Sequence, residues 1–271
     1  MIELYEKNQR IENRKSSKGN QQKWMKDGVW YKADYTGYEG LAEYIISHLL
    51  KNSTLHEKEF VLYDTEKIKY KATEFRGCKS KDFLPEGWNL ITLERLFQNM
   101  YGESLNKSIY RIGSYENRLK FIVDQTVRMT GLERFGEYMS KMLVIDAFFL
   151  NEDRHTHNIA VLMDDIGEFH RCPIFDHGAG LLSDVTMDYP LDRKLEDAME
   201  DVTAKTFCKS FEEQLEIAER LYGQQIKFSF TLKDVENILI KENYYTKEVK
   251  DRVFEVLAWQ YRKYKYLFEN K

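Results

Sequence analysis

The feature that most constrains this chain is residues 148–182, where apolar runs alternate abruptly with clustered polar side chains. The polar hexapeptide Asp153–Asn158 follows the end of a strongly apolar segment. Two short apolar runs, 159–163 and 173–175, come next, and Asp176-His177-Gly178 closes the second of them. Carboxylates and an amide at the ends of buried segments are costly unless they have a task. The pattern therefore indicates a catalytic centre.

Composition limits the class of protein. At 271 residues, with 42% hydrophobic and 14% aromatic residues, the chain is long enough for one large domain or two folded lobes. A net charge of −4 gives no general reason to bind nucleic acid or an acidic membrane, so neither is expected as a partner. Three widely spaced cysteines argue against a disulfide framework. The polar N-terminus and the lack of a bilayer-spanning apolar run complete the expectation of a cytoplasmic protein.

The first part of the chain has the patterns of a β-sheet. The Asp-Gly pair at 27–28 lies between two aromatic-rich runs, which is a hairpin signal. Helical spacing predicts one amphipathic helix over 38–51. Strands are expected at 60–63 and 68–75, joined by a polar turn. A loop with one proline and two glycines is expected over 76–87, where the β-type pattern ends.

Helical periodicity dominates the rest of the chain. Helices are expected over 116–129, from a capping box at Thr130–Glu133 to about 150, and over 208–222, 232–242 and 246–268. Residues 159–176 are expected to form a β-hairpin within this helical part. The sequence thus predicts an α+β fold with a strand-rich lobe at 1–76 and a mainly helical lobe at 77–271.

The clustered polar residues have the composition of a site for phosphoryl transfer. Asp153 and Asn158 share a loop, and Asp176 arrives on a neighbouring strand. Three oxygen donors, two carboxylates and one amide, suit a hard cation such as Mg²⁺. In phosphoryl transfer, one aspartate accepts the proton of the attacking hydroxyl, while an asparagine and a second aspartate hold the metal.

Residues that could hold nucleotide phosphates precede this cluster in a suitable order. Phosphoryl transfer also uses a lysine on a strand and an acid on a following helix that positions it. Lys32, followed by Glu39 or Glu43, fits those requirements. The small, polar loop at 16–22 precedes the lysine strand and could cover phosphates with backbone N–H groups. The ordered set is far more specific than a single D-x-x-x-x-N motif.

The motif DRHTHN at 153–158, followed by FDHG at 175–178, resembles the catalytic and metal loops of the HipA-like bacterial kinases, including the small CtkA type. Upstream, SSKGNQQKW at 16–24 resembles the family's ATP loop, and WYKAD at 30–34 resembles its lysine strand. The resemblance implies a two-lobed, protein-kinase-like fold with ATP and Mg²⁺ between the lobes. It also implies γ-phosphoryl transfer to a serine or threonine of a protein substrate, and autophosphorylation.

Applied to individual residues, the resemblance implies Asp153 as the catalytic base and Asn158 and Asp176 as metal ligands. Lys32 would contact the ATP phosphates. The other implied ATP-binding residues are Ser17, Gly19, Asn20, Gln21 and Gln22 in the loop, Glu39 (or Glu43) as the lysine partner, and Glu74 and Phe75 as the adenine-contacting hinge. Two departures from kinase patterns are the histidine in Asp176-His177-Gly178 and the single glycine in the ATP loop.

Several alternatives stay open. The D-R-H-x-x-N loop is shared with phosphoinositide kinases, so the substrate could be a lipid or small molecule, although no polybasic patch supports a lipid. A nucleotide-binding pseudokinase or toxin-module partner is a second alternative, opposed by the complete set of predicted catalytic residues. A zinc hydrolase is a third, with candidate ligands His155, His157, His170, Cys172 and His177 in a spacing that matches no zinc signature. A regulatory partner, and autophosphorylation of Ser16 or Ser17, are further hypotheses.

Overall fold

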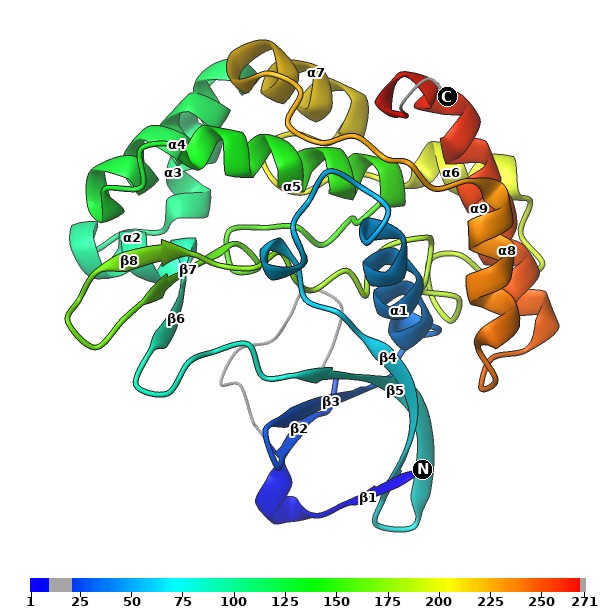
Figure 1. Ribbon diagram of the computed structural model, residues 1–271. Helices are drawn as coiled ribbons and strands as arrows, with labels where there is room; N and C mark the ends of the chain where they lie inside the picture. Colours follow the sequence, from blue (N-terminus) through cyan, green and yellow to red (C-terminus); the bar gives the residue numbers. More distant parts are fainter. Residues whose placement is uncertain (10–20, 269–271) are drawn as a thin grey trace. The chain divides into compact units, whose positions relative to one another are not determined.

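The computed structural model describes residues 1–9 and 21–268 (Figure 1). The chain forms two compact units. Unit 1 consists of Met1–Asp82, Phe175–Val202 and Lys227–Lys271, and unit 2 consists of Phe83–Ile174 and Thr203–Ile226. The expected lobe boundary after residue 76 falls inside a β-strand, and the division into lobes stays a prediction. Within the described ranges, no helix combines the length and apolar character that crossing a bilayer requires.

Unit 1 contains a five-stranded sheet. Its strands, in spatial order, are β1 (Ile2–Leu4), β4 (Asp64–Tyr70), β5 (Thr73–Lys81), β3 (Val29–Ala33) and β2 (Lys23–Lys26). Strand β1 pairs in parallel with β4, and the other neighbours are antiparallel. After β1 and a 3₁₀ turn at Glu6–Asn8, Gln9 bridges to Trp24 in β2. The two edges of the sheet are therefore linked, and the sheet is strongly curled (Figure 1).

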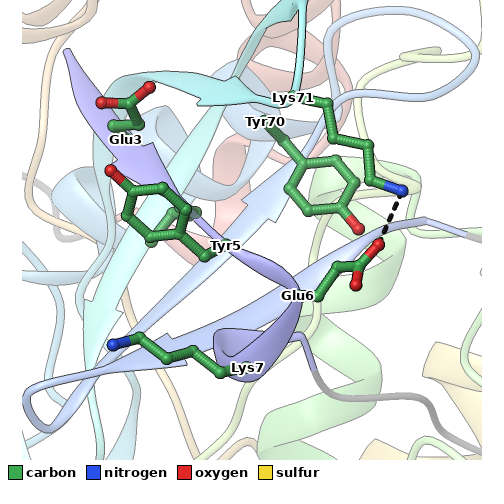
Figure 2. Close-up of a pocket in the computed structure, with 7 residues that line it drawn as sticks. Glu3, Tyr5, Glu6, Lys7, Tyr70 and Lys71 are labelled. Atoms are coloured by element: carbon green, nitrogen blue, oxygen red, sulfur yellow. Dashed lines mark ion pairs between the residues drawn. The ribbon is translucent and has the colours of Figure 1, made fainter.

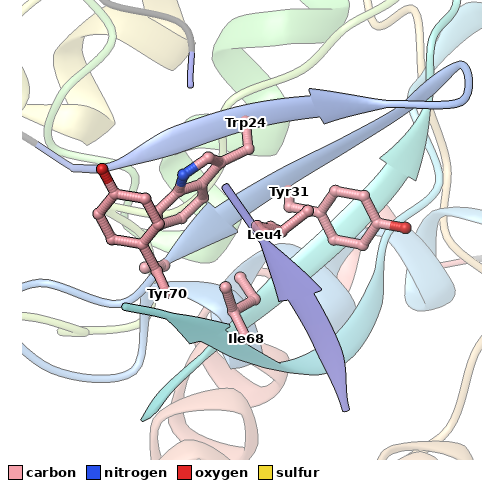
Figure 3. Close-up of a cluster of buried hydrophobic side chains, with 6 residues drawn as sticks. Leu4, Trp24, Tyr31, Ile68 and Tyr70 are labelled. Atoms are coloured by element: carbon pink, nitrogen blue, oxygen red, sulfur yellow. The ribbon is translucent and has the colours of Figure 1, made fainter. Parts of the chain in front are cut away.

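The concave face of this sheet encloses a small apolar core. Leu4, Trp24, Tyr31, Ile68 and Tyr70 come from four strands and point toward one another (Figure 3). Because side chains alternate along a strand, the inward position of Tyr31 directs the next residue of β3 to the opposite face. That next residue is the lysine of the predicted site.

The opposite face packs against helix α1 (Glu39–Leu50), which contacts β4 and β5. Nearly every residue of α1 is buried, because α8 (Leu232–Lys241) also packs against it. Helices α8 and α9 (Lys247–Lys263) lie side by side (Figure 1). Unit 1 also contains α6 (Leu195–Asp201) and 3₁₀ turns at Glu57–Glu59 and Lys265–Leu267.

The strands after α1 differ from the prediction. Residues 60–63 are not a strand, the expected turn is the start of β4, and a hairpin turn at Lys71 interrupts the expected second strand. Strand β5 continues to Lys81, through half of the expected loop. The glycine that suggested a loop is required inside the sheet, because a Cβ at Gly77 would lie 2.0 Å from the carbonyl oxygen of Lys32.

Unit 2 is mainly helical. Its helices are α2 (Leu93–Tyr101), α3 (Leu105–Arg111), α4 (Tyr115–Thr130), α5 (Phe135–Phe149) and α7 (Phe211–Tyr222). A three-stranded antiparallel sheet, in the order β6 (Asn89–Thr92), β7 (Ala160–Met163) and β8 (Phe169–Arg171), belongs to the same unit. Helix α5 is buried along almost its whole length, with only Glu137 and Lys141 outside the buried set. Its residue Asp146 supports the loop that follows the helix by pairing with Arg154.

The capping box expected at Thr130–Glu133 is absent. Gly131, with φ +74°, ends α4, and the Thr130 hydroxyl donates to the carbonyl oxygen of Thr126 within α4. Helix α5 begins at Phe135, four residues after the start that the capping box predicted, and it has no side-chain cap. The Thr-Gly pair is thus a helix end, because glycine in the left-handed conformation terminates helices.

Candidate active site

Lys32 is the centre of a buried charged cluster in unit 1. Its Nζ lies 2.7 Å from Oε1 of Glu43 in α1 and 2.8 Å from Oδ1 of Asp176. The second oxygen of Glu43 accepts the backbone N–H of His177 at 2.8 Å. Glu43 therefore connects the lysine strand with the Asp-His-Gly segment. Lys32 and Glu43 are buried, whereas the Asp176 side chain is 25% exposed.

The electrostatics of the cluster keep the lysine charged. Burial alone would lower the pKa of Lys32, but the charges of Asp176 and Glu43 outweigh it and raise that pKa well above its usual value. Burial raises the pKa of Glu43, although the charge of Lys32 opposes that rise. One ammonium faces two carboxylates, and such a set favours a further cation. Asp176, a partly exposed oxygen donor, fits Mg²⁺.

The predicted choice of Glu39 as the Lys32 partner is wrong. Its carboxylate accepts the N–H of Thr36 at 2.7 Å and that of Gly37 at 3.1 Å, in the turn before α1. Glu39 is the first residue of the helix, and its side chain folds back onto the N–H groups of the preceding turn instead of facing the sheet. Glu43, one turn later, faces the sheet and pairs with Lys32. Glu39 therefore orders the turn and does not hold the lysine.

In unit 2, the loop after α5 rests on a buried ion pair. Leu150, with φ +55°, ends the helix. The Arg154 guanidinium donates from Nε to Oδ2 of Asp146 at 2.9 Å, from Nη2 to Oδ1 at 3.1 Å, and from Nη1 to the carbonyl oxygen of Asn158 at 3.0 Å. Burial raises the pKa of Asp146, and the charge of Arg154 opposes that rise. The arginine thus spans the loop and fixes its two ends.

Asp153 and Asn158 lie together in this loop, as the sequence predicted. The Asn158 Nδ2 donates to the carbonyl oxygen of Asp153 at 2.9 Å and to its carboxylate Oδ2 at 3.4 Å. The other carboxylate oxygen, Oδ1, lies 3.8 Å from Lys205 Nζ and 3.8 Å from His155 Nε2. The Asp153 carboxylate is thus positioned by contacts within its own loop and by the ammonium of Lys205 from a distant segment.

Sequence reasoning missed the roles of three residues in and around this loop. Asp146 was noted only as an interruption of an apolar run, although a lone acid in a buried helix requires a partner. Arg154 reads as part of the motif, but its side chain is 1% exposed and is structural. Lys205 lies far along the chain from the motif, and no local pattern marks it.

The other predicted nucleotide-binding residues have mixed outcomes. Ser17, Gly19 and Asn20, together with Ser16, lie outside the described residues. Gln21 and Gln22 immediately precede β2, and the carbonyl oxygen of Gln22 accepts the N–H of Ala33 at 3.0 Å. Their predicted roles stay predictions.

Glu74 and Phe75 are placed in a position that argues against the hinge role. They lie in β5 just after the hairpin turn, opposite Lys69 and Ile68 of β4. Phe75 packs against the apolar core of the curled sheet. A hinge connects two parts of a fold, whereas these residues are inside a hairpin. The expected hinge is therefore corrected to a strand with a packing residue.

The zinc candidates do not assemble as a group. Within the described part of the chain, a set of three metal-capable side chains is formed by Asp164, Glu168 and His170 in the β7–β8 hairpin. The His170 Nε2 lies 2.8 Å from Asp164 Oδ2, so these two groups already satisfy one another. The set includes one of the five zinc candidates. It lends no support to the hydrolase alternative.

A pocket on the curled sheet of unit 1 contains none of the predicted site residues (Figure 2). It is lined by Glu3, Leu4, Tyr5, Glu6, Lys7, Tyr70 and Lys71. Its Glu6 and Lys71 side chains form an ion pair at 2.8 Å. The pocket offers paired surface charges and exposed aromatic surface, and it lacks a buried catalytic group.

The curled sheet with its buried Lys–Glu pair, and the helical part with its Asp-x-x-x-x-Asn loop, define a kinase-like fold. The proinflammatory kinase CtkA of Helicobacter pylori is similar in structure, with a TM-score of 0.59 and 17% sequence identity over 98% of this chain and 95% of that one. HipA of Shewanella oneidensis MR-1, solved with HipB and operator DNA, gives a TM-score of 0.44 and 13% identity over 87% of this chain and 58% of that one. No protein-family model and no curated protein matches the sequence. The likeness to CtkA confirms the predicted kinase-like fold.

Proposed function

We propose that this chain is an ATP- and Mg²⁺-dependent kinase that transfers the γ-phosphoryl group to a serine or threonine hydroxyl of a protein. The observation that carries the proposal is the buried Lys32 ammonium, held at 2.7 Å by Glu43 and at 2.8 Å by Asp176. Burying a lysine and its acidic partners carries a large desolvation penalty. Phosphoryl transfer gives the lysine a task, because the ammonium can pair with nucleotide phosphates.

The remaining groups have complementary roles. Asp153 accepts the proton of the acceptor hydroxyl while the new O–P bond forms and the bond from the γ-phosphorus to the bridging oxygen of ATP breaks. Asn158 and Asp176 are the oxygen ligands that would hold Mg²⁺, which neutralises phosphate charge when bound. Arg154 keeps the loop in shape through its buried pair with Asp146. Protein as the acceptor class rests on the sequence resemblance to HipA-like kinases.

The direct test is transfer of label from γ-labelled ATP. Wild-type protein with Mg²⁺ should label itself or a generic protein acceptor, and Asp153→Ala should lower the rate by roughly 10²–10⁴ because a general base is lost. Asp176→Ala should abolish labelling. Asp165→Ala, an exposed carboxylate in a turn, is the matched control and should retain wild-type activity. Labelling that survives both active-site changes would refute the assignment.

Acceptor class and self-modification can be separated in the same assay. Parallel reactions with a protein mixture and with phosphoinositide vesicles should label the protein fraction. Label found in the vesicle lipid instead would select the lipid-kinase alternative. Phosphopeptide mapping of residues 10–20 then tests modification of Ser16 or Ser17, and label at neither serine would remove that hypothesis.

A further inference from the structure

A cation from a distant segment lies beside the proposed catalytic base. The ammonium of Lys205 is 3.8 Å from the Asp153 carboxylate Oδ1, and the lysine side chain is 36% exposed. This separation is longer than a hydrogen bond, so the pair is electrostatic. His155, within the loop itself, places its Nε2 3.8 Å from the same oxygen.

The segment that carries Lys205 is anchored independently of that ion pair. The Thr206 hydroxyl donates to the carbonyl oxygen of Arg154 at 2.7 Å, inside the protein. Phe207 is fully buried, and its carbonyl oxygen accepts from Arg118 Nη1 at 2.9 Å. The packed residues after Lys205 therefore place it at the loop, and one of them is bonded directly to the loop backbone.

The other cation of the loop, Arg154, has a structural role, which leaves Lys205 as the cation beside Asp153 that could act in phosphoryl transfer. Arg154, the arginine within the motif, donates to Asp146 and to the Asn158 carbonyl oxygen and is 1% exposed. The guanidinium of Arg154 is therefore occupied in holding the loop and is not placed to contact a substrate. The phosphoryl group in transit carries negative charge on three equatorial oxygens, and a nearby fixed cation stabilises that charge. A partly exposed lysine next to the base can serve as this cation.

We propose that Lys205 is a catalytic residue whose ammonium contacts an oxygen of the phosphoryl group as it passes to the acceptor hydroxyl beside Asp153. This inference rests on the proposed kinase function. Lys205 supplies charge only, and the acceptor proton goes to Asp153. The competing explanation is that Lys205 merely balances the Asp153 charge in the folded protein.

Steady-state kinetics of full-length variants distinguish the two explanations. Lys205→Met should lower kcat by roughly 10²-fold or more, with the KM for ATP changed by less than about threefold, because the contact forms only during transfer. Lys205→Arg should restore most of the lost kcat. Lys209→Met removes an exposed lysine from the same segment and should behave as wild type. Unfolding midpoints of the three variants should agree with wild type.

Each outcome has a distinct meaning. A Lys205→Met protein with wild-type kcat, when Asp153→Ala is inactive, overturns the role of Lys205 and leaves the kinase function standing. Loss of kcat in Lys205→Met that arginine fails to restore, together with a lowered unfolding midpoint, supports the merely structural explanation and also overturns the inference. A wild-type protein that transfers no label overturns the kinase function and the inference with it.

Discussion

Asp34, two residues after Lys32, should make the stability of unit 1 depend on pH near neutrality. Its Oδ1 accepts the N–H of Gly40 at 2.7 Å, and its Oδ2 accepts the Tyr245 hydroxyl at 2.8 Å. The carboxyl thus connects the end of β3, the start of α1 and the segment between α8 and α9. Burial, reinforced by the negative charge of Glu39, raises the pKa of Asp34 from 3.8 to about 7, although the hydrogen bonds from Gly40 and Tyr245 and the charge of Arg76 oppose that rise.

The sign follows from proton uptake. Because the folded carboxyl has the higher pKa, the folded state binds more protons than the unfolded state between about pH 4 and pH 7. The stabilising effect of protonated Asp34 is complete below pH 4, falls through that window and is lost above pH 7. A shift of about three pKa units corresponds to at most about 4 kcal/mol at 1.36 kcal/mol per unit. Because Asp34 as a residue is only half-buried, solvent screening reduces this to roughly 2–3 kcal/mol.

The test is urea unfolding of wild type and Asp34→Asn between pH 5 and pH 8. Asparagine can keep both contacts without titrating, since its oxygen accepts from Gly40 and its amide donates to the Tyr245 oxygen. Relative to wild type, the variant should gain roughly 2 kcal/mol of unfolding free energy between pH 5 and pH 8. Asp165→Asn, at an exposed turn, is the control and should show no such gain. A constant difference between wild type and Asp34→Asn at every pH would refute the reasoning.

Four further substitutions separate activity from stability. Glu43→Gln should lower phosphoryl transfer by at least about tenfold because the lysine loses a charged partner. Glu39→Gln should keep the transfer rate and cost about 1 kcal/mol in urea unfolding, because its hydrogen bonds to the turn before α1 are weakened. Equal rates for both variants would contradict the assignment of Glu43 as the lysine partner. Asp146→Ala leaves Arg154 buried without its carboxylate and should cost about 3–5 kcal/mol in urea unfolding, so a cost below 1 kcal/mol would show that the pair is not needed. Gly77→Ala puts a methyl group 2.0 Å from a neighbouring carbonyl oxygen and should lower the thermal midpoint, while an unchanged midpoint would mean that the strands can separate freely.

The loop that holds Asp153 and Asn158 was predictable because the two residues are close in the sequence. It joins an apolar helix to a strand and brings them together. Lys32 was predictable as a strand lysine, because the Asp-Gly pair at 27–28 between two aromatic-rich runs indicates a hairpin whose second strand carries it. The motif order placed Lys32 and Asp176 at one predicted site, but their ion pair joins residues far apart in the chain and was not predicted.

The sequence could not decide between Glu39 and Glu43, because both lie on one face of the same helix, one turn apart. The helix start decides it, and the start depends on the turn that Glu39 itself orders. Strand β5 was missed for a different reason. Its second half reads as polar, but Cys78 and Ser80 alternate with lysines and are buried on the face that also carries Lys32. A strand whose buried residues are this small resembles a loop in sequence.

The three-part composition of unit 1 has a consequence for how the protein is made. Residues 52–54, just after α1, pair with residues 227–229, and α8 covers α1. During synthesis on the ribosome, the sheet and α1 therefore emerge long before the segments that cover them. In that interval the apolar side of α1 is open to chaperones and to neighbouring nascent chains. A gene fragment ending at Asp82 would leave that side exposed permanently, whereas a circular permutant that joins the C-terminal helices to β1 would shorten the delay.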